Sequence, residues 1–218
     1  MRLITIILTL SILVSCNLQK DPSYDKEAIA LNNQAVGLLF KYPDSALKLL
    51  DMATDIDQMY YVAYSNKITI YCYEGNYEKA TVACEKAVLA KPDVAEGVTL
   101  LGMLYDYTGQ QDKAKDQYQT AIELFDKRIR ASEKDNYANR LNRTLVLLLL
   151  GLEIEGQKEV HVLLQENPED WLVQMLVEFD KVEYLDEILN QGKQTELRRK
   201  LELEAISPAG VSLPTPTD

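Results

Sequence analysis

Few side chains in this sequence have the chemistry of catalysis or metal binding. His161 is the only histidine, and Cys72 and Cys84 have no histidine near them in the sequence. A zinc site needs about four cysteine, histidine or carboxylate ligands, so no such site is expected. Neither a Gly-x-Ser-x-Gly nucleophile turn nor a phosphate-binding Gly-x-x-x-x-Gly-Lys loop occurs. The sequence therefore predicts a protein that is not an enzyme and holds no metal ion or cofactor.

The remaining cysteine follows a short apolar segment at the start of the chain. Residues 3–14 are mostly apolar and are preceded by Arg2. The segment is shorter than the roughly 20 residues of a membrane-spanning helix, but it suits the apolar part of a signal peptide. Leu13-Val14-Ser15-Cys16 resembles the lipobox of bacterial lipoproteins, which implies cleavage before Cys16 and acylation of that residue. An ordinary secretory signal peptide is the alternative.

The resemblance to lipoproteins also implies a location. Two or more acyl chains hold a protein stably at a membrane, whereas one holds it only marginally. Asn17 stands where an aspartate retains many lipoproteins in the inner membrane, which favours the outer membrane. We expect residues 1–15 to be the signal peptide and residues 16–26 to be a lipidated tether. The protein would be anchored in the bacterial cell envelope, at the outer membrane and facing the periplasm, as in Bacteroidetes-type lipoproteins.

The net charge of the chain limits the classes of partner that it can bind. Asp and Glu outnumber Lys and Arg, which gives a formal net charge of −11 at pH 7. Such a field repels phosphate backbones and anionic lipid head groups. We therefore expect no nucleic acid partner, and we expect membrane attachment to come from the lipid alone.

Residues of the same type recur every 34 positions in the middle of the chain. The matching sets are Ala46, Ala80 and Ala114; Ala53, Ala87 and Ala121; Gly75 and Gly109; Tyr71 and Tyr105; and Tyr73 and Tyr107. A period of this length is typical of stacked units that cannot bury their apolar faces alone.

The pattern resembles the tetratricopeptide repeat, a helix-turn-helix unit with small residues where its two helices meet and a proline near its end. Gly75 and Gly109 fall where the first helix must stop, and glycine readily takes the left-handed conformation found there. The resemblance implies an all-α, right-handed α-solenoid. Its repeat domain would span residues 27–169, with units near 27–60, 61–94, 95–128 and 137–170.

Several local features complete the prediction. Asp44 or Ser45 is expected to cap the second helix of the first unit. Residues 128–136 interrupt the period, so we expect a longer helix or loop there. Residues 170–205 are predicted to be capping helices that cover the apolar end of the stack. Residues 206–218 contain three prolines and no aromatic residue, which indicates a disordered tail.

In the tetratricopeptide family the first helices line a concave surface that binds partners. Tyr73 and Tyr107 have the same position in consecutive units, so we expect them side by side on that surface; the alternative is that each packs against the adjoining hairpin. The residues that the resemblance places in this candidate groove are Val62, Ser65, Asn66, Thr69, Tyr73, Glu96, Thr99, Leu100, Met103, Asp106 and Tyr107, with Cys72 beside them.

The sequence thus predicts a non-enzymatic scaffold that binds an unidentified envelope protein or an extended peptide in this groove. One alternative is a structural protein that associates with itself as a homo-oligomer. Another is a glycan-binding or catalytic accessory protein that uses the insertion near Asn136 and a turn containing Glu153 and Glu155. For Cys72 and Cys84 the alternatives are small core residues or a disulfide.

Overall fold

The computed structural model describes residues 23–131, 136–186, 188 and 189, and these residues contain helices and no strand. The predicted signal peptide, Cys16, most of the tether, the chain beyond residue 189 and the predicted tail lie outside the described residues. The helices are α2 (Lys26–Val36), α3 (Pro43–Ile56), α4 (Tyr61–Tyr73), α5 (Tyr77–Ala90), α6 (Ala95–Tyr107), α7 (Gln111–Ala131), α8 (Tyr137–Leu150), α9 (Glu153–Glu166) and α10 (Trp171–Val177). Residues 181–186 are also helical.

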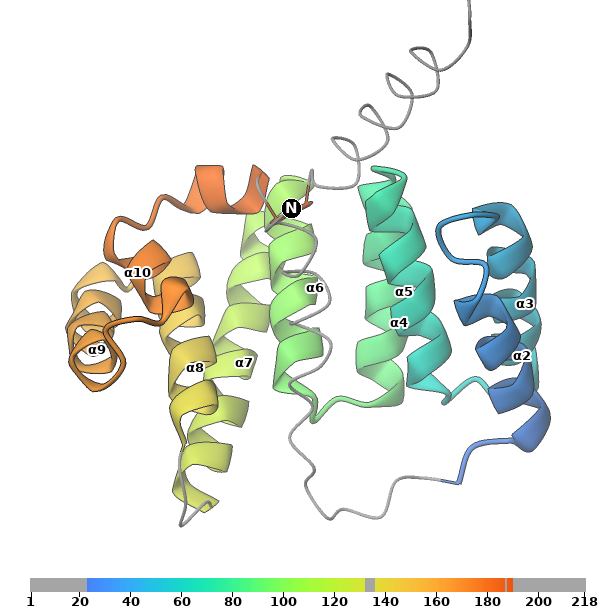
Figure 1. The fold of residues 1–218 in the computed structure, drawn as a ribbon, viewed down its shortest axis with the longest axis horizontal. Helices are drawn as coiled ribbons and strands as arrows, with labels where there is room; N and C mark the ends of the chain where they lie inside the picture. Colours follow the sequence, from blue (N-terminus) through green and yellow to red (C-terminus); the bar gives the residue numbers. More distant parts are fainter. Residues whose placement is uncertain (1–22, 132–135, 187, 190–218) are drawn as a thin grey trace, which may run out of the picture.

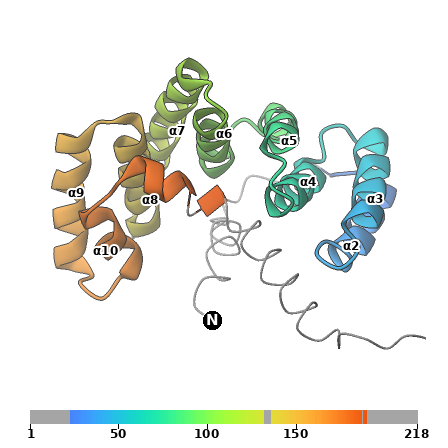
Figure 2. The same cartoon turned by 90° about the horizontal axis from the view of Figure 1, so that it is seen from above.

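The helices form hairpins that stand side by side in chain order (Figure 1). The pairs α2/α3, α4/α5, α6/α7 and α8/α9 each pack as antiparallel neighbours, and each pair also contacts the next. Seen from above, the hairpins follow an arc, with α4, α6 and α8 on its inner side and α5 and α7 on its outer side (Figure 2). The all-α architecture therefore has the layout of a solenoid.

Left-handed glycines end the first helix of three hairpins. Gly75, Gly109 and Gly151 have φ values of 69°, 77° and 84°, a region that other residues rarely adopt. Next to Gly75, the Asn76 amide donates to the carbonyl of Tyr71 at 2.8 Å, the bond that closes a Schellman cap. The prediction of left-handed stops at Gly75 and Gly109 is confirmed.

Two other glycines allow close helix approaches. A Cβ atom added to Gly102 on α6 would lie 2.6 Å from a ring carbon of Tyr118 on α7. A Cβ atom added to Gly156 on α9 would lie 2.5 Å from a methyl carbon of Leu148 on α8. In both hairpins a large side chain occupies the space that a glycine leaves.

Two local predictions are wrong. Helix α3 begins at Pro43 after Tyr42, which makes no side-chain cap, so neither Asp44 nor Ser45 has the capping role. Proline fixes a helical φ and needs no backbone partner in the first turn, which makes it sufficient to start the helix. Glu153 and Glu155 do not lie in a long turn, because both belong to the first turn of α9. There their charge suits the positive end of the helix dipole.

The interruption of the period has a simple structural form. Helix α7 has 21 residues and continues to Ala131, so the first part of the insertion lengthens that helix. In its last turn Arg128 and Arg130 suit the negative end of the helix dipole.

The buried apolar residues form two clusters. The smaller lies around the first hairpin and reaches Ala63 and Ile70 of α4. The larger runs from Tyr64 through the later hairpins to Leu189. Helix α4 therefore contributes to both clusters and joins the first hairpin to the rest of the stack.

The C-terminal part divides in two. Helix α10 packs against α9, where Gln157 donates its side-chain amide to the carbonyl of Leu176 at 3.0 Å, so α10 covers the last hairpin. Residues 181–186, 188 and 189 instead turn back along the inner side of the arc. This second part differs from the predicted end cap because its apolar side chains join the larger core cluster and its two ends bind Asp106 of α6 and Tyr77 of α5.

Candidate functional site

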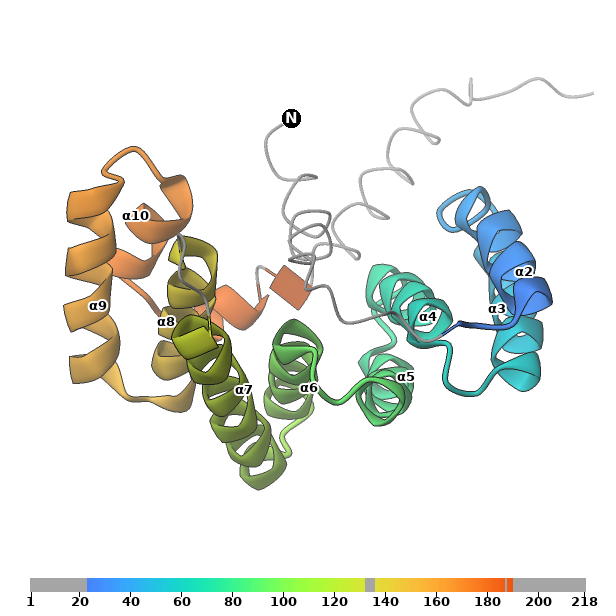
Figure 3. The ribbon, with the colours of Figure 1, turned by 90° about the horizontal axis from the view of Figure 1, so that it is seen from below.

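Helices α4 and α6, which contain the predicted groove residues, line the inner side of the arc (Figure 3). The part of this side that faces α2 is polar. The side-chain amide of Asn66 donates to Asn32 on α2 at 2.7 Å, across a separation of 34 residues. The two asparagines thus have the same position in consecutive units. The hydroxyls of Ser65 and Thr69 donate to carbonyls of their own helix.

The two predicted groove tyrosines contact different rings. Tyr73 meets Phe40, from the turn of the first hairpin, with ring centroids 5.3 Å apart and an edge-on geometry. Tyr107 meets Tyr77, at the start of α5, with centroids 4.6 Å apart. Such edge-on pairs are the favoured geometry for aromatic side chains. These contacts favour the alternative in which each tyrosine packs within the stack.

Thr99 and Met103 were placed in the groove incorrectly. Met103 is fully buried and Thr99 is 5% exposed, so neither offers surface to a partner. Met103 lies about one turn and Thr99 about two turns before Asp106 on α6, whose carboxylate pairs with Lys181.

The two groove carboxylates are already paired within the chain. Glu96 accepts from Arg128 of α7 at 2.7 Å, and the same guanidinium donates to the carbonyl of Asp93. Asp106 accepts from the hydroxyl of Tyr118 at 3.2 Å and forms an ion pair with Lys181. Burial, and then Asp106, raise the pKa of Tyr118 well above its usual value. Neither carboxylate is arranged as a catalytic acid or base.

The accessible part of the inner surface lies towards α2. Val62, Ser65, Asn66, Thr69 and Tyr73 of α4 and Leu100 of α6 are half-buried. Beside them the first hairpin exposes about half of Val36 and of Phe40. Sequence reasoning missed these two residues. The signal was available, because Val36 follows Asn32 by one helical turn and so shares its face.

The thiol of Cys84 is buried, that of Cys72 is half-buried, and both are unreactive. Cys72 and Cys84 are both free cysteines in the structure, and the Cys84 thiol faces the carbonyl of Gly97 at 3.6 Å. Burial raises the pKa of Cys72 to about 12 and also raises that of Cys84. Thiols that remain protonated are poor nucleophiles and poor metal ligands. Both behave as small core residues.

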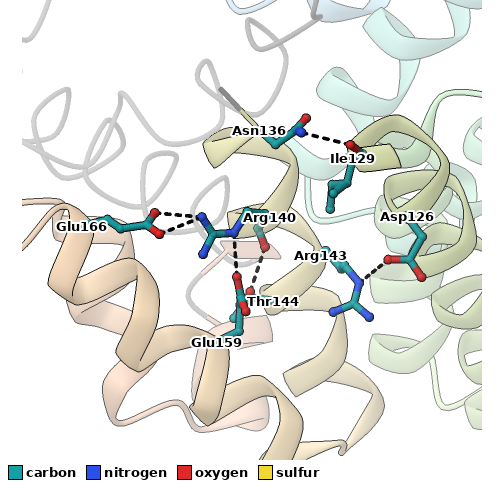
Figure 4. A network of polar contacts seen from close by, with 8 residues as sticks. All are labelled: Asp126, Ile129, Asn136, Arg140, Arg143, Thr144, Glu159 and Glu166. Atoms are coloured by element: carbon teal, nitrogen blue, oxygen red, sulfur yellow. Dashed lines mark hydrogen bonds and ion pairs between the residues drawn. The ribbon is translucent and has the colours of Figure 1, made fainter. Parts of the chain in front are cut away.

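Carboxylates near the insertion bind arginines rather than enclose a pocket. Arg140 of α8 pairs with Glu159 and Glu166 of α9, and Figure 4 shows its guanidinium between them. Arg143 pairs with Asp126 of α7 at 2.6 Å and with Glu155 of α9 at 3.1 Å.

Burial lowers the pKa of the two guanidiniums, and their hydrogen bonds to the carboxylates outweigh that effect and raise it. The network joins α7, α8 and α9. It pairs Glu155, one of the two glutamates on which the accessory-protein alternative depends, with Arg143.

The outer side has a cleft between α3 and α5. It has a volume of about 630 Å³ and includes Met59, Tyr64, Lys67, Tyr71, Lys79, Val82, Lys86 and Leu89 among its lining residues. Val82 is 56% exposed and Leu89 is 70% exposed, and they lie seven residues apart on one face of α5. Sequence analysis did not identify this surface, although the spacing of the two residues was visible.

Within the described residues, no group of three or more histidine, cysteine, aspartate or glutamate side chains is placed to hold a metal ion. No helix in that part of the chain combines the length and the apolar character needed to cross a membrane.

Comparison with known proteins supports the fold. A family model described as tetratricopeptide repeat matches residues 95–127, which are α6 and most of α7. No curated protein matches the chain. The chain is similar to the solved structure of YrrB, which is described as a tetratricopeptide repeat protein with an unusual peptide-binding site. The identity is 20%, the coverage is 83% of this chain and 88% of that chain, and the TM-score is 0.50.

Two further solved structures have lower scores. For MamA the identity is 19%, the coverage is 65% of this chain and 79% of that chain, and the TM-score is 0.47. For the Sgt2 tetratricopeptide repeat domain from Aspergillus fumigatus the identity is 15%, the coverage is 89% of this chain and 90% of that chain, and the TM-score is 0.41. The expected all-α, tetratricopeptide-like fold is confirmed, and no catalytic family is indicated.

Proposed function

We propose that this tetratricopeptide-like chain is a non-catalytic scaffold lipoprotein of the bacterial envelope, which binds a protein or an extended peptide on its concave side. The observation that carries the proposal is the inner surface formed by α2 and α4. It combines the exposed apolar side chains of Val36 and Phe40 with the half-buried amide of Asn66, which a hydrogen bond to the buried Asn32 holds in place. Aromatic anchors beside fixed polar groups are typical of recognition surfaces.

The fold supports the class of function. YrrB is described as having a peptide-binding site, and its likeness to this chain lies in the fold. Stacked helical hairpins offer extended concave surfaces, and their use is usually recognition. The titratable residues of the inner side are engaged in ion pairs or held in the core, which leaves shape, aromatic contact and amide hydrogen bonding as the means of recognition.

The membrane part of the proposal rests on the sequence around Cys16. Removal of residues 1–15 would leave Cys16 as the acylated N-terminus, about ten residues before α2. Metabolic labelling with an alkyne fatty acid tests this: we expect label on the wild-type chain and none on Cys16→Ser. Fractionation of the labelled protein tests the outer membrane, and label in the inner membrane fraction would contradict that location.

Binding is tested by crosslinking the anchored protein in intact cells. Phe40→Ala/Tyr73→Ala removes the aromatic pair formed by the exposed Phe40 and the half-buried Tyr73. Val82→Ala/Leu89→Ala removes a similar apolar area from the outer cleft and is the matched control. We expect the first variant to lose most of the crosslinked partner and the second to keep it.

The opposite result would move the binding surface to the outer cleft. Light scattering of the chain without residues 1–16 addresses the self-association alternative. A stable dimer or filament that is lost in the Val82→Ala/Leu89→Ala variant would favour that alternative over a foreign partner.

A further inference from the structure

Residues 181–186, 188 and 189 form a returning segment on the inner side of the arc, beside α6 (Figure 3). The segment is fixed by polar contacts at both ends. At its start, the Lys181 ammonium pairs with the Asp106 carboxylate and lies 5.7 Å from the centre of the Tyr118 ring. At its end, the hydroxyl of Tyr77 donates to the carbonyl of Leu189 at 2.5 Å.

Between these ends the contact is apolar. Tyr184, Leu185 and Leu189 are each less than a tenth exposed and belong to the larger core cluster, with Tyr77 and Met103. Their spacing is that of one face of a helix.

The opposite face of the segment is open. Val182 is 73% exposed, and Glu183 and Asp186 are exposed as well. An amphipathic helix lying with its apolar face in a groove is a common mode of peptide recognition.

The charge of the groove specifies its occupant. The Asp106 side chain is only 7% exposed, whereas Lys181 is 38% exposed and can leave at lower cost. A buried carboxylate needs a cation or several hydrogen bonds, because burial without them is unfavourable. Any helix that takes the place of this segment must therefore bring a lysine or arginine to Asp106.

We propose that the inner surface at Tyr77 of α5, Asp106 of α6 and Tyr118 of α7 is a receptor for an amphipathic helix and that residues 181–186, 188 and 189 are its resident, displaceable occupant. The partner helix carries a cation, then large apolar residues three, four and eight positions later, as Lys181, Tyr184, Leu185 and Leu189 do. The inference deepens the proposed function and rests on it, because it names a partner class and a regulation for the same concave side. While the resident segment is bound, the apparent affinity for a partner is reduced by the fraction of chains in which the groove is open.

The test uses the full chain and a fluorescein-labelled peptide of residues 178–190. Lys181→Glu in the full chain places a carboxylate against that of Asp106 and weakens the binding of the resident segment, while the receptor residues stay unchanged. We expect this variant to bind the peptide about tenfold more tightly than the wild-type chain, because more of its grooves are open. Val182→Ser, on the exposed face of the same segment, is the matched control and should bind like the wild type.

Two further measurements keep the result interpretable. A peptide that itself carries Lys181→Glu should bind at least about tenfold more weakly than the unchanged peptide, since it places a carboxylate against Asp106. Leu185→Ala in the full chain weakens the apolar contact of the resident segment without changing the receptor, and it should raise peptide affinity if circular dichroism shows that Lys181→Glu disturbs folding.

Equal peptide affinity for the wild type and for both loosened variants would overturn the proposal, because the segment would then be a fixed part of the core. Failure of the proposed function has a different signature. In that case the peptide still binds the loosened variants, but Phe40→Ala/Tyr73→Ala leaves the cellular crosslink unchanged.

Discussion

The third hairpin, α6/α7, and the fourth, α8/α9, bring their helices together by the same device placed on opposite helices. In the third, the glycine is Gly102 on the first helix and the large residue is Tyr118 on the second. In the fourth, the glycine is Gly156 on the second helix and the large residue is Leu148 on the first. The fourth hairpin adds the arginine network of Figure 4.

The comparison shows how a repeat can drift in sequence and keep its geometry. The match to the repeat family covers residues 95–127, in the third hairpin. The pattern of the family records which positions are small. Close packing requires only that one of two facing positions be small, so the helices can exchange these roles without moving apart.

The largest effect is expected at Gly102. In Gly102→Ala the new Cβ would lie 2.6 and 2.7 Å from two ring carbons of Tyr118, which is 1% exposed and hydrogen-bonded to Asp106. The ring has no room to move, so α6 and α7 must separate. We expect the free energy of unfolding, measured in urea, to fall by about 1–3 kcal/mol.

Gly97→Ala is the control on the same helix. Its Cβ would meet Val94 at an ordinary 3.7 Å, so the better helix propensity of alanine should leave stability unchanged or raised by up to about 1 kcal/mol. Equal losses in the two variants would mean that the close approach to Tyr118 does not limit position 102.

The arginine network should contribute less, and in a way that depends on salt. Arg140→Met removes pairs with Glu159 and Glu166 while keeping much of the apolar stem. Because these groups are partly exposed, we expect a loss of about 1 kcal/mol that shrinks in 1 M salt. Urea unfolding at low and high salt measures it, with the exposed Lys158→Met as control. A salt-independent loss would assign the role of Arg140 to packing.

A smaller effect is expected at Gly156. In Gly156→Ala the Cβ would lie 2.5 and 2.9 Å from the Cδ2 and Cγ atoms of Leu148. These atoms belong to a flexible side chain that can change rotamer, and alanine adds about 1 kcal/mol of helix propensity. The net change in the free energy of unfolding should stay within about 1 kcal/mol. A loss as large as that of Gly102→Ala would show that the fourth hairpin is packed as rigidly as the third.

The smallest change at neutral pH is expected for Tyr118→Phe, which loses one hydrogen bond to Asp106 and should cost about 1 kcal/mol or less. Its signature is the pH dependence. Burial and then Asp106 raise the pKa of Tyr118, so the native chain keeps a proton that the unfolded chain loses near pH 10. The contribution to stability is complete below about pH 10 and is lost as pH rises further. Urea unfolding between about pH 8 and 11 should therefore show a weaker alkaline loss in Tyr118→Phe; equal slopes would contradict the buried tyrosine.

Much of the fold was accessible from the sequence because its signals are local. The left-handed stops at Gly75 and Gly109 follow from the conformational freedom of glycine, and the start of α3 at Pro43 follows from the fixed φ of proline. The expectation that Asp44 or Ser45 caps α3 was wrong. Several residues near a helix start can take the N-cap position, and the sequence alone does not show which one does.

The candidate site was less predictable. The resemblance placed Met103 in the groove from its position in the repeat, and the structure buries it in the core. Val36 and Phe40 were missed because the candidate groove residues were all taken from the second and third units, whereas these two lie in the first. Burial of a groove residue depends on what lies above it, and the repeat position carries no information about that.

The sequence by itself determined the helices, their turns and the 34-residue period that stacks them, because each depends on interactions within a few turns or between adjacent units. Only the tertiary structure decided that residues 181–189 return across the stack to place Leu189 against Tyr77, 112 positions away. Such a contact forms when the curvature of the whole array brings distant surfaces together. No local spacing encodes that curvature, since it is the sum of small rotations between neighbouring hairpins.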